Sequence, residues 1–130
     1  MIRTLPLALC ALLVSNAALA LSLGQIQTQS ALNQKFEAAI PLHGIEPAEL
    51  PSVHASLASS EAFAKAGIAR PYWLTRLKFH PEEDDGGTPV IRVQSRELVQ
   101  EPYVDFLIEV TAPQGKLLRQ YSVLLDPPEL

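Results

Sequence analysis

Apolar and polar side chains alternate with a period of two along much of the chain, which is typical of β-strands with one face on a core. The segments that carry this pattern, or are apolar enough to form strands, are residues 35–40, 52–57, 73–80, 90–93, 106–110 and 117–125, and the polar residues 25–29 form a candidate edge strand. Short strands separated by turn signals predict a mainly β fold, an antiparallel β-sandwich that is Ig-like in general architecture. A small, partly open barrel is the alternative.

One segment departs from this alternation and predicts a short helix at residues 59–66. The hydroxyl of Ser59 or Ser60 can accept a hydrogen bond from the free amides of the first turn. Phe63 is expected to face the core, and Gly67 suits the left-handed position that ends a helix. A helix of this length is stable only when it docks on a sheet.

Two turns are also predicted. Ala112-Pro113-Gln114-Gly115 should join the last two strands as an antiparallel hairpin. The acidic residues 82–85, followed by two glycines, should form a loop between two other strands. This acidic run lacks the alternating ligand spacing of calcium loops, so a solvated turn is the preferred interpretation.

The first twenty residues have the pattern of a signal peptide. Arg3 gives a positive start, residues 5–14 are apolar, and Ala18-Leu19-Ala20 supplies small residues for cleavage. We therefore expect residues 1–20 to be removed after Ala20, leaving a domain at 21–128 and a tail at 129–130. The alternatives are an uncleaved anchor, because residues 5–23 are nearly long enough to span a bilayer, and acylation of Cys10 in a lipobox-like context.

Cleavage changes the composition. The chain has 10 basic and 14 acidic residues, so loss of Arg3 leaves 9 and 14 and a net charge of −5. This balance argues against nucleic acid as a partner. The single cysteine leaves with the leader, which excludes a disulfide framework and thiolate metal sites in the mature chain. No membrane span is expected after cleavage.

No constellation for catalysis is evident. The three histidines, His43, His54 and His80, lack the spacing of a zinc site. There is no nucleophile elbow and no glycine-rich phosphate loop. The sequence therefore predicts a protein that is not an enzyme, with no catalytic residues, metal or cofactor.

Four residues are candidates for binding. Tyr72 and Trp73 follow the fixed kink at Pro71, where they could stack on sugar rings; alternatively, Trp73 fills the core and only Tyr72 is outside. Leu107 falls on the outward phase of its strand, as does at least one leucine of the pair that Leu117 begins. Either a helix or sheet covers these leucines, or they form an apolar patch for a partner. The pairing edge of a terminal strand is another contact route.

Several ordered blocks resemble the N-terminal domain of the FimV/HubP family. They lie at residues 21–26, 30–34, 37–40, 57–59, 63–67 and 70–71, and most clearly at 101–110 (EPYVDFLIEV), 115–121 (GKLLRQY) and 124–128 (LLDPP). Family members are large inner-membrane scaffolds of Gram-negative bacteria, associated with type IV pilus assembly, twitching motility and cell-pole organisation. Their LysM module, membrane span and cytoplasmic half have no counterpart here, so the resemblance implies only the periplasmic domain.

From this resemblance we expect a non-catalytic periplasmic interaction or scaffold module. Its expected partners are proteins of the envelope or the pilus machinery. One alternative is a module that binds peptidoglycan, and another is a truncated remnant of a longer FimV-like protein.

Overall fold

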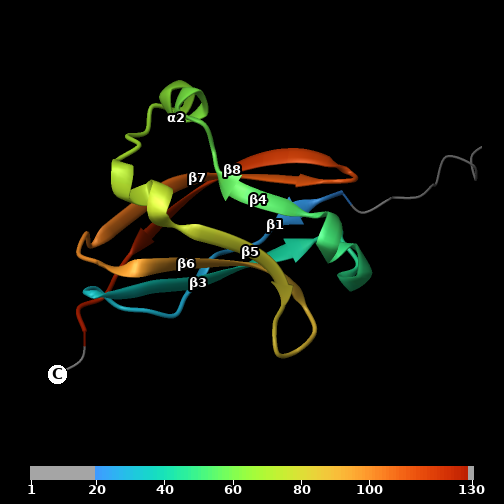
Figure 1. Cartoon of the computed structure of the whole chain (residues 1–130), viewed down its shortest axis with the longest axis horizontal. Helices are drawn as coiled ribbons and strands as arrows, with labels where there is room; N and C mark the ends of the chain where they lie inside the picture. Colours follow the sequence, from blue (N-terminus) through green and yellow to red (C-terminus); the bar gives the residue numbers. More distant parts are fainter. Residues whose placement is uncertain (1–19, 129–130) are drawn as a thin grey trace, which may run out of the picture.

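The computed structural model describes residues 20–128, and these form two antiparallel sheets packed face to face (Figure 1). The predicted signal peptide, apart from Ala20, and the tail at 129–130 lie outside the described residues. The larger sheet contains β1 (Ser22–Leu23), β2 (Gln27–Thr28), β3 (Gln34–His43), β6 (Pro89–Val99) and β5 (Lys78–Glu83), with β1 and β2 both paired to β3. The smaller sheet has the order β4 (His54–Leu57), β7 (Tyr103–Ala112), β8 (Gly115–Leu124). The predicted β-sandwich is confirmed, and the barrel is not formed.

The core lies between the two sheets and follows the period of two. From β3 it takes Phe36, Ala38, Ile40 and Leu42, and from β7 it takes Val104, Phe106, Ile108 and Val110, none of them more than 2% exposed. Phe106 is central, because its ring centroid lies 6.0 Å from that of Phe79 and 5.9 Å from that of Tyr121. These aromatic contacts connect β5 of the larger sheet to β7 and β8 of the smaller one.

The helix α2 (Ser60–Ala66) confirms the prediction for residues 59–66. The hydroxyl of Ser59 accepts a hydrogen bond from the amide of Ala62, and Gly67 ends the helix with a φ of 73°. Phe63 is 1% exposed and belongs to the core cluster. In Figure 1, α2 lies above the smaller sheet, on the side away from the larger one.

The prediction of a strand over residues 73–77 is wrong. Pro71 precedes a 3₁₀ helix, η2 (Tyr72–Arg76), and β5 begins only at Lys78. The hydroxyl of Thr75 donates to the carbonyl of Tyr72 at 2.6 Å and holds the turn. Leu74 and Leu77 are the buried residues, and their spacing of three is the period of a 3₁₀ helix rather than of a strand.

Other predicted elements exist with different lengths. The strand predicted at residues 90–93 extends to Val99 in β6, and the edge strand predicted at 25–29 is reduced to two residues in β2. A second 3₁₀ helix, η1 (Pro47–Ser52), precedes β4.

The predicted hairpin joins β7 and β8, with Ala112 opposite Gly115 and a φ of 147° at Gly115. The acidic loop is shorter than predicted, because Glu82 and Glu83 belong to β5. In the turn that follows, the carboxylate of Asp84 accepts hydrogen bonds from the amides of Gly86 and Thr88.

Tyr121 provides a test of the packing between β8 and the N-terminal segment. Its ring is 5% exposed, and its hydroxyl donates to the carbonyl of Gly24 at 2.7 Å. Burial raises the pKa of this phenol above its ordinary value of 10.0, an effect that the nearby Arg119 partly opposes. Because the folded pKa exceeds the unfolded one, the stabilisation is present below pH 10 and is lost as pH rises through the folded pKa.

We expect Tyr121→Phe to lower the free energy of unfolding by about 1 kcal/mol at neutral pH, since one hydrogen bond is lost. The difference in the free energy of unfolding between the two proteins should shrink above about pH 10. There the Tyr121 phenol ionises more readily in the unfolded parent than in the folded one, which favours unfolding of the parent alone. Urea unfolding at several alkaline pH values measures this, with Tyr72→Phe as the exposed control. Parallel loss of stability in both proteins would contradict the assignment.

Candidate binding surface

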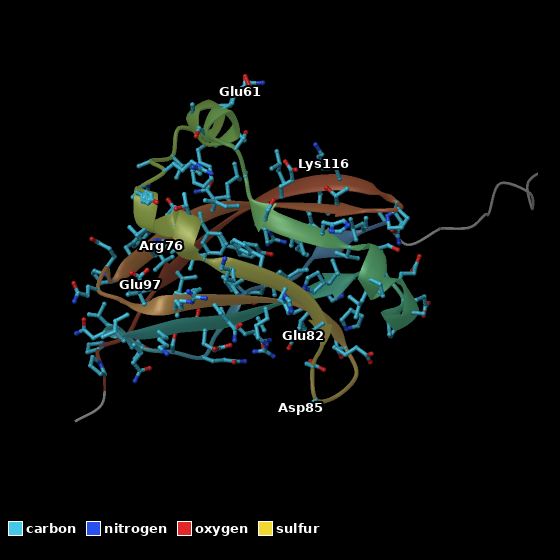
Figure 2. The ribbon with its side chains drawn as sticks, in the orientation of Figure 1. Glu61, Arg76, Glu82, Asp85, Glu97 and Lys116 are labelled. Carbon is cyan, nitrogen blue, oxygen red and sulfur yellow. The ribbon has the colours of Figure 1, made fainter. Side chains whose placement is uncertain are left out.

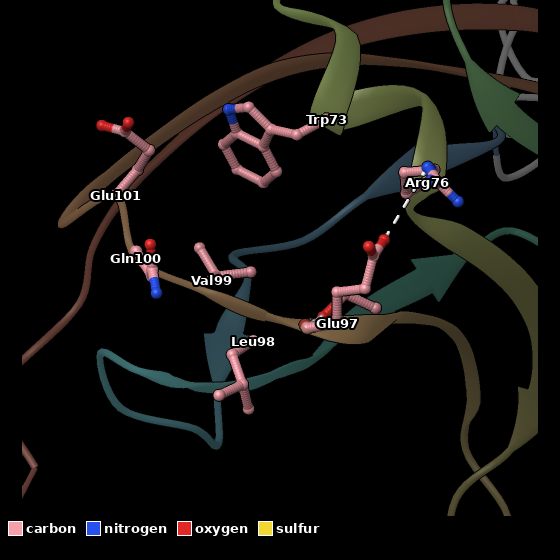
Figure 3. Close-up of a pocket in the computed structure, with 8 residues that line it drawn as sticks. Trp73, Arg76, Glu97, Leu98, Val99, Gln100 and Glu101 are labelled. Atoms are coloured by element: carbon pink, nitrogen blue, oxygen red, sulfur yellow. Dashed lines mark hydrogen bonds and ion pairs between the residues drawn. The ribbon is translucent and has the colours of Figure 1, made fainter.

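Two adjoining hollows lie at one end of the sandwich, where η2 faces the end of β6 and the start of β7. The first encloses about 230 Å³ and the second about 320 Å³, and both are lined by Trp73 and Glu101. Figure 3 shows the first hollow, with Trp73 on one side and residues 97–101 on the other. The second is completed by Ile68, Ala69, Pro71, Tyr103 and Asp105.

The 3₁₀ geometry of η2 determines how its aromatic residues are presented. Leu74 is fully buried and anchors the helix, so the preceding Trp73 lies at the edge of the core, partly buried and facing both hollows. Tyr72 is 71% exposed. Trp73 therefore packs against the core and also lines a surface cavity.

An irregularity in β6 forms the opposite wall. Three residues, Ser95, Arg96 and Glu97, lie opposite the single residue Phe36, because the register shifts between Lys35 and Glu37 of β3. The Ser95 hydroxyl accepts a hydrogen bond from the Phe36 amide and donates one to the Glu97 carbonyl, both at 2.7 Å. These two bonds satisfy the Phe36 amide and the Glu97 carbonyl at the irregularity, and Ser95 and Glu97 line the first hollow across from η2.

Exposed apolar side chains surround these hollows. Leu98 beside the first hollow is 58% exposed, and Tyr103 in the second is also 58% exposed. Leu124 is 70% exposed and lies directly opposite Tyr103 in the β7–β8 register. We call the set formed by Tyr72, Trp73, Leu98, Tyr103 and Leu124 the aromatic end.

The charged residues beside the aromatic end differ in whether they form ion pairs. Arg76 lies 3.7 Å from Glu97 (Figure 3). Its guanidinium also lies 5.9 Å from the ring centroid of Tyr72. Glu101 and Asp105 belong to no ion pair among residues 20–128. The Asp105 carboxylate instead accepts hydrogen bonds from Gln120 and Ser122, each at 3.0 Å.

The predicted leucines lie elsewhere. Leu107 is 7% exposed and lies in a separate groove of about 470 Å³ between α2 and the outer face of β7 and β8. Leu118 is the outward residue of the leucine pair, at 49% exposure, whereas Leu117 packs against the core. Figure 2 shows Glu61 of α2 and Lys116 of β8 on this same side of the molecule. The structure thus brings Tyr72 and Trp73 together, but not with Leu107 or Leu117.

Sequence reasoning missed Leu98, Tyr103 and Leu124. Tyr103 and Leu124 could have been found, since Tyr103 shares the outward phase of Leu107, and Leu124 shares that of Leu118. Leu98 was missed because the predicted strand ended at Val93, whereas β6 continues to Val99 with Leu98 on its outward phase.

The titratable groups with shifted pKa values lie outside the aromatic end. A hydrogen bond from Arg92 to Glu82, at 2.7 Å, is the main cause that raises the pKa of Arg92, with Glu37 adding to it from 3.4 Å. Within residues 20–128, no three His, Cys, Asp or Glu residues are grouped so that they could hold a metal ion. No helix in that part of the chain is both long and apolar enough to cross a membrane.

The family model for the FimV N-terminal Ig-like domain matches residues 21–128. The chain belongs to the FimV N-terminal domain family. Among its relatives is the motility hub protein FimV of two Pseudomonas aeruginosa strains, PAO1 and UCBPP-PA14, each 50% identical over 129 residues and 98% of this chain. The chain spans 14% of the length of these FimV proteins. The resemblance read from the sequence blocks is confirmed.

A solved structure is also similar, the BIgI domain of beta protein from S. agalactiae bound to CEACAM1. It is 7% identical, with a TM-score of 0.40, and the match covers 85% of this chain and 99% of that one.

Proposed function

We propose that the chain is a non-catalytic interaction module of the FimV type that works in the periplasm of a Gram-negative bacterium. Residues 1–20 would direct its export, with cleavage after Ala20. Its partners would be proteins of the envelope or the type IV pilus machinery, in keeping with the motility hub role that names its relatives. The observation that carries the proposal is the aromatic end, where exposed apolar side chains adjoin two hollows.

The composition of the aromatic end suits a protein partner. Tryptophan, tyrosine and arginine supply most of the binding energy in protein interfaces, whose centres are apolar and whose rims are polar. Here Arg76, Glu97 and Gln100 provide such a rim around Trp73 and Leu98. The surface therefore combines an apolar centre with groups that can fix the orientation of a partner.

Capture from periplasmic extract tests this proposal. We expect the processed chain to retain defined envelope or pilus proteins, identified by mass spectrometry. The double variant Trp73→Ala/Tyr103→Ala should lose them, with affinity reduced at least about 30-fold because two central aromatic contacts of about 1 kcal/mol or more each are removed. Leu118→Ala, an exposed leucine in the other groove, is the matched control. Equal retention by the double variant and the parent would refute a role for the aromatic end.

Peptidoglycan is the second candidate partner. The indole of Trp73 could stack on a sugar ring while Gln100, Glu101 and Arg76 bind its hydroxyls. Trp73 is the single tryptophan of the sequence, so its fluorescence reports on this site alone. Titration with soluble wall fragments and co-sedimentation with purified wall in the absence of other proteins would favour this alternative; no response to the fragments and no sedimentation would exclude it.

A further inference from the structure

The second hollow of the aromatic end has an unusual combination of side chains. Two aromatic residues, Trp73 and Tyr103, and two carboxylates, Glu101 and Asp105, line the same cavity of about 320 Å³. Its remaining walls are the apolar residues Ile68, Ala69 and Pro71. No basic side chain lines this hollow, although it holds two acidic ones.

The nearest basic residues in sequence are engaged elsewhere. Arg70 donates to the carbonyl of Ala58 at 3.2 Å and lies 5.5 Å from the ring centroid of Phe63. Arg76 is paired with Glu97 in the first hollow. Glu101 and Asp105 are consequently left without an ionic partner among the described residues, beside two aromatic rings.

We propose that the second hollow binds the cationic end of a lysine or arginine side chain from a partner protein. Aromatic faces attract cations, and carboxylates form charge-assisted hydrogen bonds with ammonium and guanidinium groups. The hydrogen bonds from Gln120 and Ser122 hold the Asp105 carboxylate in a fixed orientation. The volume of the second hollow is near the lower end of the range for typical ligand pockets, roughly 300–1,000 Å³, which suits one long side chain.

The surroundings favour a protein segment as the source of the cation. Leu124 lies opposite Tyr103, and Leu98 lies beside the adjoining hollow, so exposed apolar surface continues past the cation site. A partner that covers this surface needs apolar residues next to its basic one. The chain also carries a net charge of −4, which attracts basic segments. This inference rests on the proposed function and specifies the chemistry of the partner.

The test uses single-residue probes on the processed chain. N-acetyl-lysine amide and N-acetyl-arginine amide are titrated to about 100 mM, because ligands with so few atoms bind weakly. We expect saturable shifts in the NMR signals of the Trp73 indole and the Tyr103 ring. N-acetyl-norleucine amide, which has a similar length but no charge, should bind at least about fivefold more weakly. Equal binding of the charged and neutral probes, or no shift at the highest concentration, would overturn the inference.

A charge variant separates this inference from the proposed function. Glu101→Gln keeps the size of an exposed side chain and should weaken binding of the lysine probe about three- to tenfold. Glu61→Gln, in the groove beside α2, is the matched control. If Glu101→Gln leaves probe binding unchanged while Trp73→Ala/Tyr103→Ala still abolishes capture of partner proteins, the cation site is refuted and the interaction module stands.

A second titration tests peptidoglycan as the source of the cation, with a wall peptide that has a free side-chain amine as the probe. Binding of this peptide more tightly than N-acetyl-lysine amide, with the same dependence on Glu101, would assign the hollow to peptidoglycan and overturn the assignment to a protein. Weaker or equal binding supports a protein segment as the ligand.

Discussion

Phe106→Ala is expected to lower the free energy of unfolding by about 3–5 kcal/mol, which is the range for removal of a fully buried phenylalanine. Phe106 is completely buried and contacts Phe79 and Tyr121. These neighbours come from β5 and β8, so the cavity would open between the two sheets, where neither can close it alone. Because domains of this size are stable by only about 5–15 kcal/mol, the variant should be near the limit of folding.

Urea unfolding followed by circular dichroism measures this effect. Tyr103→Ala, from the same strand but 58% exposed, is the matched control and should change stability by less than about 1 kcal/mol. Phe106→Leu should fall between the two, since it keeps most of the buried volume. If Phe106→Ala unfolds at the same urea concentration as the Tyr103 control, then Phe106 is not the centre of the core.

Phe63→Ala is expected to detach α2 from the smaller sheet and to lower the free energy of unfolding by about 3 kcal/mol or more. Phe63 is the buried residue of α2, and a helix of seven residues is not stable in water by itself. Because Leu107 lies in the groove beneath α2, loss of the helix should also expose this leucine. The damage should be local at first and should leave the rest of the sandwich folded.

Hydrogen exchange distinguishes local from global loss. The amides of Phe63, Gly67 and Ile68, which are bonded within the helix and its cap, should exchange much faster in the variant. The amides of β7 should remain protected. Lys65→Ala, which truncates an exposed side chain of α2, is the control. Uniform loss of protection across both α2 and β7 would show that α2 is an integral part of the cooperative core instead.

The elements that the sequence predicts well are those whose information is local. Ser59 and Gly67 mark the two ends of α2, and Pro113 and Gly115 mark the final hairpin, so both features form where expected. The strands β3 and β7 are also clear, because one buried face gives them a plain period of two.

Residues 73–77 show where such reasoning stops. Trp73, Thr75 and Leu77 alternate as a strand would, but the burial of Leu74 and Leu77 and the bond from Thr75 to Tyr72 favour a 3₁₀ turn. Over five residues, a period of two cannot be distinguished from a period of three unless the residues that pack against the core are known. The extension of β6 was missed for a related reason, since residues 94–97 are polar and show no buried face. Pairing with β3 at Gln94 and again at Leu98, on either side of the irregularity, continues the strand to Val99.

The candidate site was only partly predictable. Tyr72 and Trp73 could be identified because aromatics beside a proline are conspicuous, and both belong to the aromatic end. The choice between Leu117 and its neighbour depended on a register that only the paired strand determines. The coincidence of Trp73 with Glu101 and Tyr103 is tertiary, since nearly thirty positions separate them in the chain.

The irregularity in β6 contains two surplus residues, since the pairing passes from Glu37–Gln94 to Lys35–Leu98. An even number restores the inside–outside phase, so Val93 and Val99 both remain in the core. Evolution could therefore lengthen or shorten this segment in steps of two and reshape the recognition surface without rewriting the interior. Insertion or deletion of a single residue would instead turn Val99 to solvent. At this point of β6, changes in length that keep Val99 in the core therefore come in pairs of residues.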